Sequence, residues 1–523
     1  MAERMRWARY AAWAALAGVV SAAVFLAVAE LAALVVARES SPILAVGSFV
    51  IDVVPQPIKE FAISTFGDQD KLVLLGSLGV AVVIASAIAG VLQLVRPPLG
   101  VVALGVAGAL SMAAIVTRAG ASAWAWLPPV LGAVAGSIVL AVAVRRLRGW
   151  RDGRAAGSDS GSEPAAPGPD RRAFLQVLTI AGASALLVGV GARVANVATT
   201  SIAAVRRALR LPEPRTRVTV PDGAELDVPG ISPLYTPNAD FYRVDTALTV
   251  PSVDPASWVL RIDGLVDRTV ELTFDELVGM GLDEYSITLT CVSNEVGGGL
   301  VGTARWLGVP VRDVLALAGP QGDADMVLSR SVDGYTASTP LDALTDAGRD
   351  AILAVAMNGE PLPLEHGFPV RMVVPGLYGY VSATKWLTGL TVTTFAADEA
   401  YWTPRGYSAK APIKFSSRMD TPRTGQPVPA GRVPLAGVAW AQTVGIERVE
   451  VRIDDEPWQA ATLSSPVNDD TWVQWMLEWD ATPGNHNVTV RAVNRAGDLQ
   501  IEERAPIAPD GSTGWQRTLI RVT

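Results

Sequence analysis

Few residues of this chain are able to do metal or nucleophilic chemistry, because it contains one cysteine, Cys291, and two histidines, His366 and His486. Cys291 follows a short β-rich run, and three glycines, Gly297–Gly299, come soon after it. Glycines let a bulky group approach the backbone closely. Three roles are open to Cys291: a small buried hydrophobic residue, a nucleophile with His366 as its base, or a metal ligand.

The scarcity of cysteine and histidine excludes several classes of protein. A lone cysteine forms no intrachain disulfide, ligates no cysteine-bound iron–sulfur cluster and provides no c-type haem attachment motif. Two histidines also argue against a zinc site built from several His or Cys. Neither histidine lies in the apolar first part of the chain, which excludes a bis-histidine haem there. The net charge of −8 makes nucleic acid an unsuitable partner.

Five apolar stretches are long enough to cross a bilayer, and they predict a transmembrane helical bundle. They are roughly Tyr10–Ala37, Leu72–Val95, Leu99–Val116, Ala121–Val144 and Ala173–Ala192. Pro128 and Pro129 are expected to kink the fourth span. Glu30, inside the first, is a candidate functional residue unless it lies near the membrane interface.

The arginines predict the orientation of the bundle. Arg4, Arg6 and Arg9 precede the first span, and a second group fills the segment from Arg145 to Arg172. Because positively charged loops stay in the cytoplasm, we expect the N-terminus inside and everything after the fifth span outside. The chain is therefore predicted to be a multi-pass protein of the plasma membrane with an extracytoplasmic C-terminal half.

The cytoplasmic linker ends in Asp170-Arg171-Arg172-Ala173-Phe174-Leu175, just before the fifth span. One interpretation is positive charge that anchors a helix. The other is an internal twin-arginine export signal, which would suit a domain that receives a cofactor before export.

Two long motifs carry a family resemblance. The run TLTCVSNEVGGGLVGTARWLGVPVRDVL and the later run PLEHGFPVRMVVPGLYGYVSATKWL resemble the sulfite oxidase family of molybdopterin enzymes. The resemblance covers roughly residues 235 to 523. It implies an α+β molybdopterin-binding domain followed by an immunoglobulin-like β-sandwich of the kind that serves for dimerisation. The strand-rich pattern from Val433 to Thr523 agrees with a β-sandwich.

The sequence is thus divided into six parts. They are a four-span region (1–150), a cytoplasmic linker (151–172), a fifth transmembrane helix with the RRxFL motif (173–195), a connector (196–229), the catalytic domain (230–411) and the immunoglobulin-like dimerisation domain (412–523).

The resemblance also implies a molybdenum–molybdopterin cofactor, with Cys291 as the thiolate ligand of the metal. His366 and Arg371 match the clasp of the pterin phosphate, although outside the motif His366 would be read as a hydrogen-bonded core histidine. Lys385 matches the lysine at the pterin end, where the preceding Ala383 and Thr384 contribute backbone groups.

Two further segments are implied to lie at the cofactor. In Phe241–Asp245 the resemblance assigns Tyr242, Arg243 and Asp245 to the segment that covers the pterin, with Arg243 directed toward the metal. Tyr407 matches an active-site tyrosine that faces the substrate; the alternative is a packed surface tyrosine. The stretch Ser329–Asp333 is expected near the cofactor.

The chain departs from the family where an oxyanion would bind. The stretch after Cys291 contains Glu295 and no cation, and Val244 and Asp245 replace an asparagine–histidine pair. Both changes remove positive character from the substrate side. We therefore expect sulfite to be a poor substrate.

The predicted function is that of a membrane-anchored molybdopterin-dependent oxidoreductase that transfers an oxygen atom and two electrons. Alternatives are a reductase of S-oxides or N-oxides similar to methionine-sulfoxide repair enzymes, a cofactor-free membrane scaffold and, more weakly, a transporter. Without haem or an iron–sulfur cluster of its own, the enzyme needs a separate electron partner, a cytochrome or a quinone. A homodimer through the C-terminal domain is also expected.

The orientation gives a first prediction. A reporter that is active only in the cytoplasm should work when fused near Gly157 and fail when fused after Thr523, because the arginine-rich segment is retained inside. Paired fusions compared in intact cells measure this. The reverse pattern would contradict the arginine-based orientation.

Overall fold

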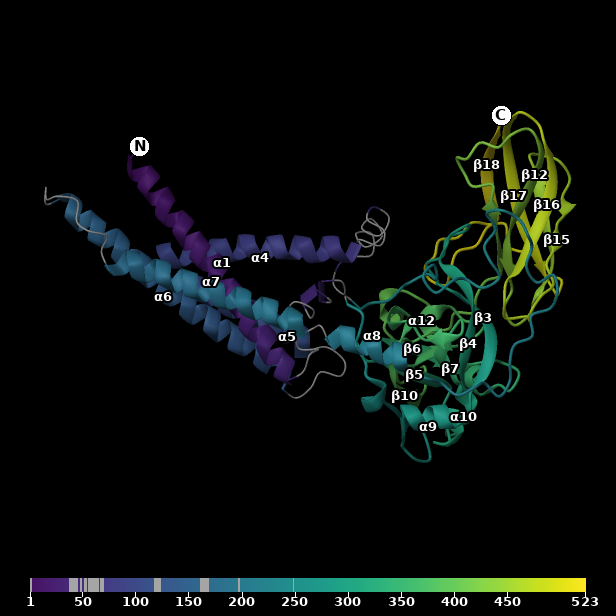
Figure 1. Cartoon of the computed structure of the whole chain (residues 1–523), viewed down its shortest axis with the longest axis horizontal. Coiled ribbons are helices and arrows are strands. Elements are labelled where there is room, and N and C mark those ends of the chain that lie inside the picture. The colour runs from purple at the N-terminus through teal and green to yellow at the C-terminus, as the bar shows by residue number, and fades with distance from the viewer. Residues whose placement is uncertain are drawn as a thin grey trace. The chain divides into compact units, whose positions relative to one another are not determined.

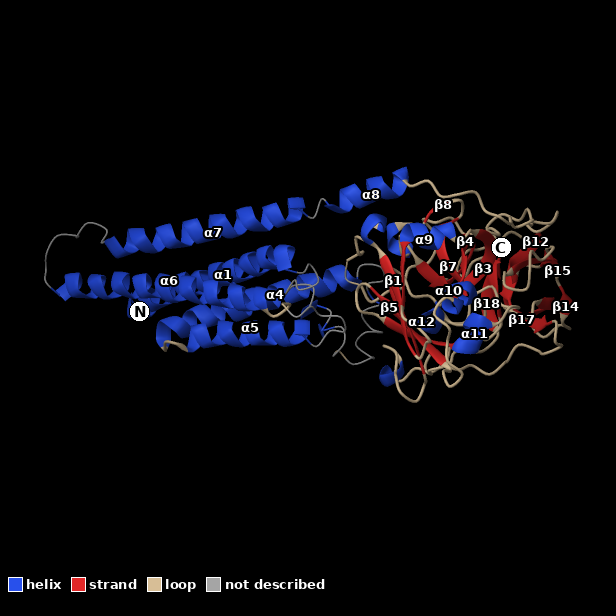
Figure 2. Ribbon diagram, turned by 90° about the horizontal axis from the view of Figure 1, so that it is seen from below, coloured by secondary structure: helices blue, strands red, loops and turns tan. Residues whose placement is uncertain are grey.

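The computed structural model describes residues 2–36, 46–47, 49–50, 54, 65, 70–116, 124–159, 169–195, 198–247 and 249–523. The chain forms two compact units, Met1–Thr199 with Thr246–Thr249, and Thr200–Asp245 with Val250–Thr523. The elements of the first unit are helices, whereas strands dominate the second (Figure 2).

Long helices build the first unit (Figure 1). They are α1 (Ala2–Val36), α4 (Asp70–Val95), α5 (Leu99–Val116), α6 (Leu127–Asp159) and α7 (Pro169–Ala195). Within the described residues, four helices are long and apolar enough to cross a membrane, in α1, α4, α5 and α6. They coincide with the first four predicted spans. The predicted fifth span falls on α7, which is not among these four, so its place in a membrane stays a prediction.

One detail of the helical prediction was wrong. Pro128 and Pro129 do not kink a span, because α6 begins at Leu127 and both prolines lie in its first turn. Proline is tolerated there, since the first N–H groups of a helix have no intrahelical partner. The predicted linker, 151–172, is helical up to Asp159 and from Pro169, and its role as a linker stays a prediction. Its middle, 160–168, lies outside the described residues.

The arginine motif belongs to the packed part of the first unit. Phe174 is fully buried, and its ring lies 5.9 Å from that of Trp13 and 6.1 Å from that of Trp150. The Arg171 guanidinium lies 5.6 Å from the Trp150 ring centroid. The contacts fit the anchoring interpretation of the motif. A role in export stays a prediction, since a signal would act before this packing forms.

Glycines allow α1 and α4 to approach closely. A Cβ atom on Gly18 would come within 1.9 Å of the Ser86 carbonyl oxygen, and one on Gly90 within 2.0 Å of the Ala14 carbonyl oxygen. Small residues at helix crossings of apolar bundles let backbones come together in this way.

The second unit begins with α8 (Ala198–Ala208), inside the segment predicted as a mere connector. The chain then passes to a five-stranded sheet with the strand order β2-β1-β10-β5-β6. Its strands are β1 (Val259–Gly264), β2 (Val270–Thr273), β5 (Met326–Ser331), β6 (Thr336–Pro340) and β10 (Leu387–Thr393). β1 pairs parallel with β10, and the other neighbours are antiparallel.

A second sheet carries the segment around Cys291. It has the order β3-β4-β7-β8, and β9 also pairs with β7. The bounds are β3 (Asp283–Thr290), β4 (Val301–Pro310), β7 (Ile352–Met357), β8 (Glu360–Pro361) and β9 (Arg371–Val373). Every residue of β7 is buried, as its continuous apolar run requires of a central strand. Four short helices accompany the two sheets: α9 (Phe274–Gly279), α10 (Val311–Ala316), α11 (Leu341–Thr345) and α12 (Gly379–Ser382).

The C-terminal part consists of two four-stranded antiparallel sheets (Figure 1). One contains β11 (Ser416–Thr421), β12 (Gly431–Trp440), β15 (Thr462–Leu463) and β16 (Val473–Ala481). The other contains β13 (Ile446–Ile453), β14 (Gln459–Ala460), β17 (Gly484–Asn494) and β18 (Gln516–Val522). Both contribute to one apolar core that includes Leu435, Val451, Trp475 and Val490. The predicted sandwich is therefore present, while its immunoglobulin-like class and its role in dimerisation stay predictions.

The crossing of α1 and α4 gives a second prediction. Gly90→Val should lower the melting temperature of the detergent-solubilised protein, because overpacking against backbone costs about 1–3 kcal/mol. Gly76→Val on the same helix is the control, since a Cβ atom there has nothing within 4 Å. Equal melting temperatures for the two variants would contradict the close crossing.

Candidate functional site

Cys291 opens the loop between β3 and β4. Its N–H donates to the Leu300 carbonyl oxygen at 2.9 Å, and the Leu300 N–H donates to Asn294 Oδ1 at 2.8 Å. These bonds close the loop at its base, and Gly297 has a φ of +81°, which favours glycine. The loop therefore presents a defined, largely buried cysteine.

Cys291 lies in an apolar and aromatic environment. Burial raises the pKa of the thiol, although hydrogen bonding with Ser293 acts in the opposite direction. Burial also raises the pKa of Tyr242, Tyr335 and Tyr378, and a negative charge on Cys291 adds to each of these shifts. A thiolate at Cys291 therefore needs a cation or a metal beside it.

Arg371 supplies a buried cation at the start of β9. Its Nη1 donates to the His366 carbonyl oxygen at 3.2 Å, and its guanidinium lies 5.1 Å from the Trp306 ring centroid. Burial lowers the pKa of Arg371 to about 10. Its Nε has no hydrogen-bond partner within the described residues. The group is thus able to donate to an anion from outside the protein.

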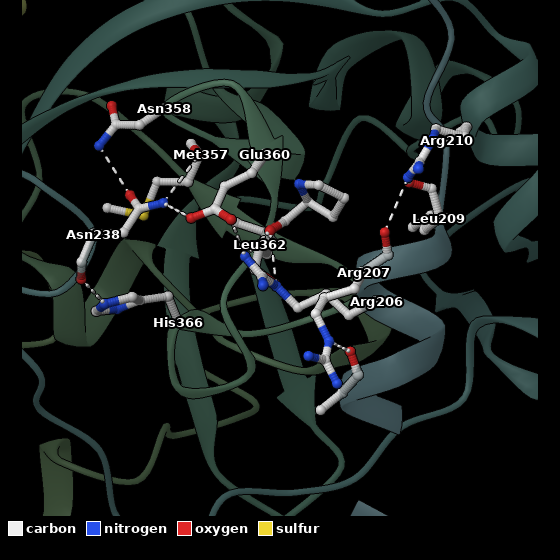
Figure 3. A network of polar contacts seen from close by, with 12 residues as sticks. Arg206, Arg207, Leu209, Arg210, Asn238, Met357, Asn358, Glu360, Leu362 and His366 are labelled. Carbon is white, nitrogen blue, oxygen red and sulfur yellow. Dashed lines mark hydrogen bonds and ion pairs between the residues drawn. The ribbon is translucent and has the colours of Figure 1, made fainter. Parts of the chain in front are cut away.

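His366 ends the short 3-10 helix Leu364–His366 and is buried. Its Nε2 lies 3.1 Å from the Asn238 carbonyl oxygen. Figure 3 marks this contact with a dashed line. A carbonyl only accepts, so Nε2 carries the proton and Nδ1 remains an acceptor. Burial, together with the charge of Arg371, lowers the pKa of His366 to about 4. The imidazole is therefore neutral at physiological pH.

Lys385, Asp245 and Arg243 form one ionic group. Asp245 Oδ2 lies 2.7 Å from Lys385 Nζ and 2.9 Å from Arg243 Nε. Burial lowers the pKa of Lys385 to about 8, although Asp245 acts to raise it. Lys385 Nζ also donates to the Glu365 carbonyl oxygen at 3.0 Å. The fold thus brings Lys385, which was predicted from a distant motif, next to the segment Tyr242–Asp245.

Small polar groups complete this neighbourhood. Thr384 Oγ1 lies 2.7 Å from Ser329 Oγ, which joins the two predicted segments Ala383–Lys385 and Ser329–Asp333. Within the described residues, the buried hydroxyls of Thr290 and Ser331 have no hydrogen-bond partner. Buried hydroxyls are seldom left unpaired, so such groups are expected to face a ligand or water.

Tyr407 lies in an aromatic cluster and is largely buried. Its ring is 5.6 Å from that of Tyr380 and 5.3 Å from that of Trp402. Tyr335, one of the tyrosines that respond to charge on Cys291, donates from its hydroxyl to the Tyr380 carbonyl oxygen at 2.8 Å. A role of Tyr407 toward a substrate stays a prediction.

The C-terminal sandwich holds the Cys291 loop from outside the cradle, a feature that sequence reasoning missed. Arg418 Nη1 donates to the Gly298 carbonyl oxygen at 3.0 Å, and Ser512 Oγ donates to the Asn294 carbonyl oxygen at 2.7 Å. Arg418 also pairs with Asp420 at 2.6 Å, and both side chains are buried. The acceptors are backbone carbonyls, which carry no sequence signal.

The arrangement suits a large anionic group that is bound through a thiolate. We use the name cofactor cradle for Tyr242, Arg243, Asp245, His366, Arg371 and Thr384–Lys385. The orphaned Nε of Arg371 and the unpaired hydroxyls of Thr290 and Ser331 are donors aimed at no protein acceptor. The residues present therefore fit the molybdenum–molybdopterin group that the sequence motifs imply.

Comparisons with known proteins agree with this arrangement. Residues 247–402 match the family described as oxidoreductase molybdopterin binding domain. Human mitochondrial sulfite oxidase is 31% identical over 341 residues, which cover 55% of this chain and 62% of that protein. Sulfite oxidase of Gallus gallus is 31% identical over 334 residues, which cover 54% of this chain and 72% of that protein. Nitrate reductase [NAD(P)H] of Hordeum vulgare is 29% identical, covering 48% of this chain and 35% of that protein.

The contact between Arg418 and the loop gives a third prediction. Cys291 is the only thiol, so its alkylation under native conditions reports the opening of the loop. Arg418→Met with Asp420→Asn removes the contact to Gly298 without leaving a buried charge unpaired. A charge-assisted hydrogen bond contributes about 1.5–3 kcal/mol, so alkylation should become roughly ten to a hundred times faster.

Arg432→Met is the matched control, because Arg432 lies on β12 of the same sandwich and its side chain is 77% exposed. Its alkylation rate should equal that of the parent protein. Equal rates in the double variant and this control would show that Arg418 does not hold the loop.

Proposed function

Because the chain belongs to the sulfite oxidase family of molybdopterin-dependent oxidoreductases, we propose that it transfers an oxygen atom and two electrons at a molybdenum site in its second unit. The observation that supports the proposal is that buried Cys291 and the buried cations Arg371 and Lys385 share one neighbourhood. Tyr242 interacts electrostatically with both Cys291 and Arg371, and Arg371 in turn interacts with Lys385. The aligned part of the chain covers 62% of the length of the human relative. The substrate and the partners of this chain are therefore proposals.

The cradle residues have distinct proposed roles. Arg371 and Lys385 bind the phosphate of the pterin, and neutral His366 accepts a hydrogen bond at Nδ1. Ala383 and Thr384 position the pterin end, while Tyr242 covers it. Cys291 ligates the metal through its thiolate, which suits a soft ligand. When bound, the cofactor supplies the redox chemistry by cycling between two oxidation states of molybdenum.

The charges around the cradle argue against a doubly charged oxyanion as the substrate. Arg243 is the predicted cation on the substrate side, but Asp245 pairs with it at 2.9 Å. Glu295, in the Cys291 loop, is exposed and adds a negative charge. Electrostatic complementarity in a partly dehydrated pocket is strong, so this balance disfavours sulfite. It favours a neutral oxygen donor or acceptor.

The same balance supports the second candidate function, the reduction of an S-oxide or an N-oxide. The S-oxide and N-oxide groups are neutral as a whole, so they need no cluster of arginines. Oxidation and reduction differ only in the direction of electron flow. Assays with sulfite and with methionine sulfoxide, each with a redox dye, distinguish the two directions.

Electrons are proposed to leave or enter through a separate partner, a cytochrome or a quinone. The sequence has too few cysteines and histidines for its own haem or iron–sulfur centre of the usual kinds. The helices α1, α4, α5 and α6 are proposed to anchor the enzyme in the plasma membrane, with the catalytic domain extracytoplasmic. A homodimer through the C-terminal sandwich is proposed from the family resemblance.

The thiolate assignment gives a fourth prediction. Cys291→Ser should abolish turnover, because serine is a harder and more basic ligand than cysteine. The melting temperature should stay close to that of the parent protein, since the two side chains are similar in size. Metal and pterin analysis of both proteins, followed by dye-coupled assays, checks this. Full activity of the serine variant would overturn the assignment.

The charge balance gives a fifth prediction. The kcat/KM for sulfite should lie below the ~10⁴–10⁸ M⁻¹s⁻¹ range of enzymes acting on their own substrates. Asp245→Asn should raise it, per bound molybdenum, by about tenfold, because the variant leaves Arg243 uncompensated. A parent value within that range would show that the pocket suits sulfite.

A further inference from the structure

Helix α8 packs on the core beneath the cofactor cradle. Ile202 is buried in the same apolar cluster as Phe241, Trp306 and Phe368. Phe241 in turn contacts the His366 ring edge to face, with the ring centroids 5.6 Å apart. The helix is therefore part of the catalytic domain, although its sequence looked like a connector.

Arg206 fixes α8 to the segment that leads to His366. Its Nε donates to the Leu362 carbonyl oxygen at 2.7 Å, and its Nη2 donates to the Pro361 carbonyl oxygen at 2.7 Å (Figure 3). Nη2 also pairs with Glu360 Oε2 at 2.9 Å, and the Arg206 side chain is only 16% exposed. One side chain thus bonds three successive residues of the segment.

A chain of hydrogen bonds continues from Glu360 to the imidazole. Asn238 Nδ2 donates to Glu360 Oε1 at 2.7 Å, and the Asn238 carbonyl oxygen faces His366 Nε2 at 3.1 Å. Asn358 Nδ2 donates to Asn238 Oδ1 at 2.9 Å, so the asparagine is held at both ends of its amide (Figure 3). Burial acts to raise the pKa of Glu360, but the hydrogen bonds from Asn238 and Arg206 hold it below its usual value. Glu360 therefore stays an acceptor for both neighbours.

The other arginines of this region lack such contacts. Arg207 Nε donates to the Ala203 carbonyl oxygen at 3.2 Å, and Arg210 Nη1 donates to the Arg207 carbonyl oxygen at 2.9 Å. Both are exposed and bond only to backbone of their own segment in the contacts that involve described residues. Arg207 is thus a neighbour of Arg206 with the same side chain and a different environment.

We propose that α8 is a latch on the cofactor cradle and that Arg206 is its positioning residue, which orients His366 through Glu360 and Asn238. The inference deepens the proposed function, since the cradle is the site that would hold the cofactor. The latch follows closely after α7, which ends at Ala195, whereas α8 begins at Ala198. Displacement of α8 from its seat would free the His366 segment and weaken cofactor retention.

The two histidines make a direct test possible. Labelling the full-length, detergent-solubilised, cofactor-free protein with ¹⁵N-histidine gives signals from His366 and His486 alone. In the parent protein, His366 should show the Nε2–H tautomer and should not titrate between about pH 5 and 8. The charged groups that act on it are Arg371, Lys385 and Glu365, and none of them is altered.

In Arg206→Met, the tautomer preference of His366 should be lost, because Nε2 no longer donates to a carbonyl oxygen that is held in place. The pKa of His366 should stay below the ordinary 6.5, since burial and the charge of Arg371 persist and the lost bond to Asn238 acted to raise it. Arg206→Lys should give an intermediate result, because an ammonium keeps the pair with Glu360 but does not reach two carbonyls in a planar fork. Arg207→Met should leave His366 unchanged, and His486 should be unchanged in every variant.

A His366 signal in Arg206→Met that matches the parent protein would overturn the proposal. If Arg206→Met does not fold, Glu360→Gln tests the proposal instead. This variant keeps the hydrogen bonds from Arg206 to the carbonyl oxygens but removes the carboxylate that lies between Arg206 and Asn238. A shifted tautomer in that variant supports the latch, and an unchanged one overturns it.

Cofactor retention separates the latch from the proposed function. Parent protein that binds no molybdenum or pterin would contradict the proposed function and leave the histidine spectra readable. Where the parent protein does bind the cofactor, Arg206→Met should retain several-fold less of it than Arg207→Met. Equal retention would overturn the part of the proposal that concerns the cofactor.

Discussion

The burial of the Arg371 guanidinium without a carboxylate partner is the constraint on which the rest of the site depends. Within the described residues, the guanidinium contacts the His366 carbonyl oxygen and the Trp306 ring, and its Nε makes no hydrogen bond. A buried charge is strongly destabilising unless it is paired. Other contacts must therefore hold the surrounding segments in place when no anion is bound to Arg371. A phosphate-bearing cofactor would supply that anion.

Two parts of the second unit provide that support from different sides. Helix α8 contacts the segment before His366 through Arg206, and the C-terminal sandwich contacts the Cys291 loop through Arg418 and Ser512. In each of these contacts the acceptors are backbone carbonyl oxygens. The contacts therefore fix the course of the backbone without using the side chains of the cradle. The sandwich therefore has a role within a single chain, whether or not it also mediates dimerisation.

Charge compensation inside the cradle separates this chain from a simple oxyanion binder. Asp245 pairs with both Lys385 and Arg243, so two of the cations near the site already have a counterion. Arg371 makes no ion pair within the described residues, which makes it the strongest proposed anchor for a phosphate. This distribution of charge supports the proposal that the site binds an anionic cofactor but attracts an anionic substrate only weakly.

The sequence by itself determined the family and the four apolar helices of the first unit, because motif spacing and long apolar runs are local signals. It predicted the residues of the cradle, whose roles stay proposals. It also indicated that a change at Asp245 would alter the charge of the site. Only the tertiary structure decided that Asp245 pairs with Lys385, 140 residues away, and that Arg206 bonds to the segment before His366. The reason is physical: an arginine in a short helix has the same local pattern whether it is solvated, like Arg207, or bonded to carbonyls of a distant segment.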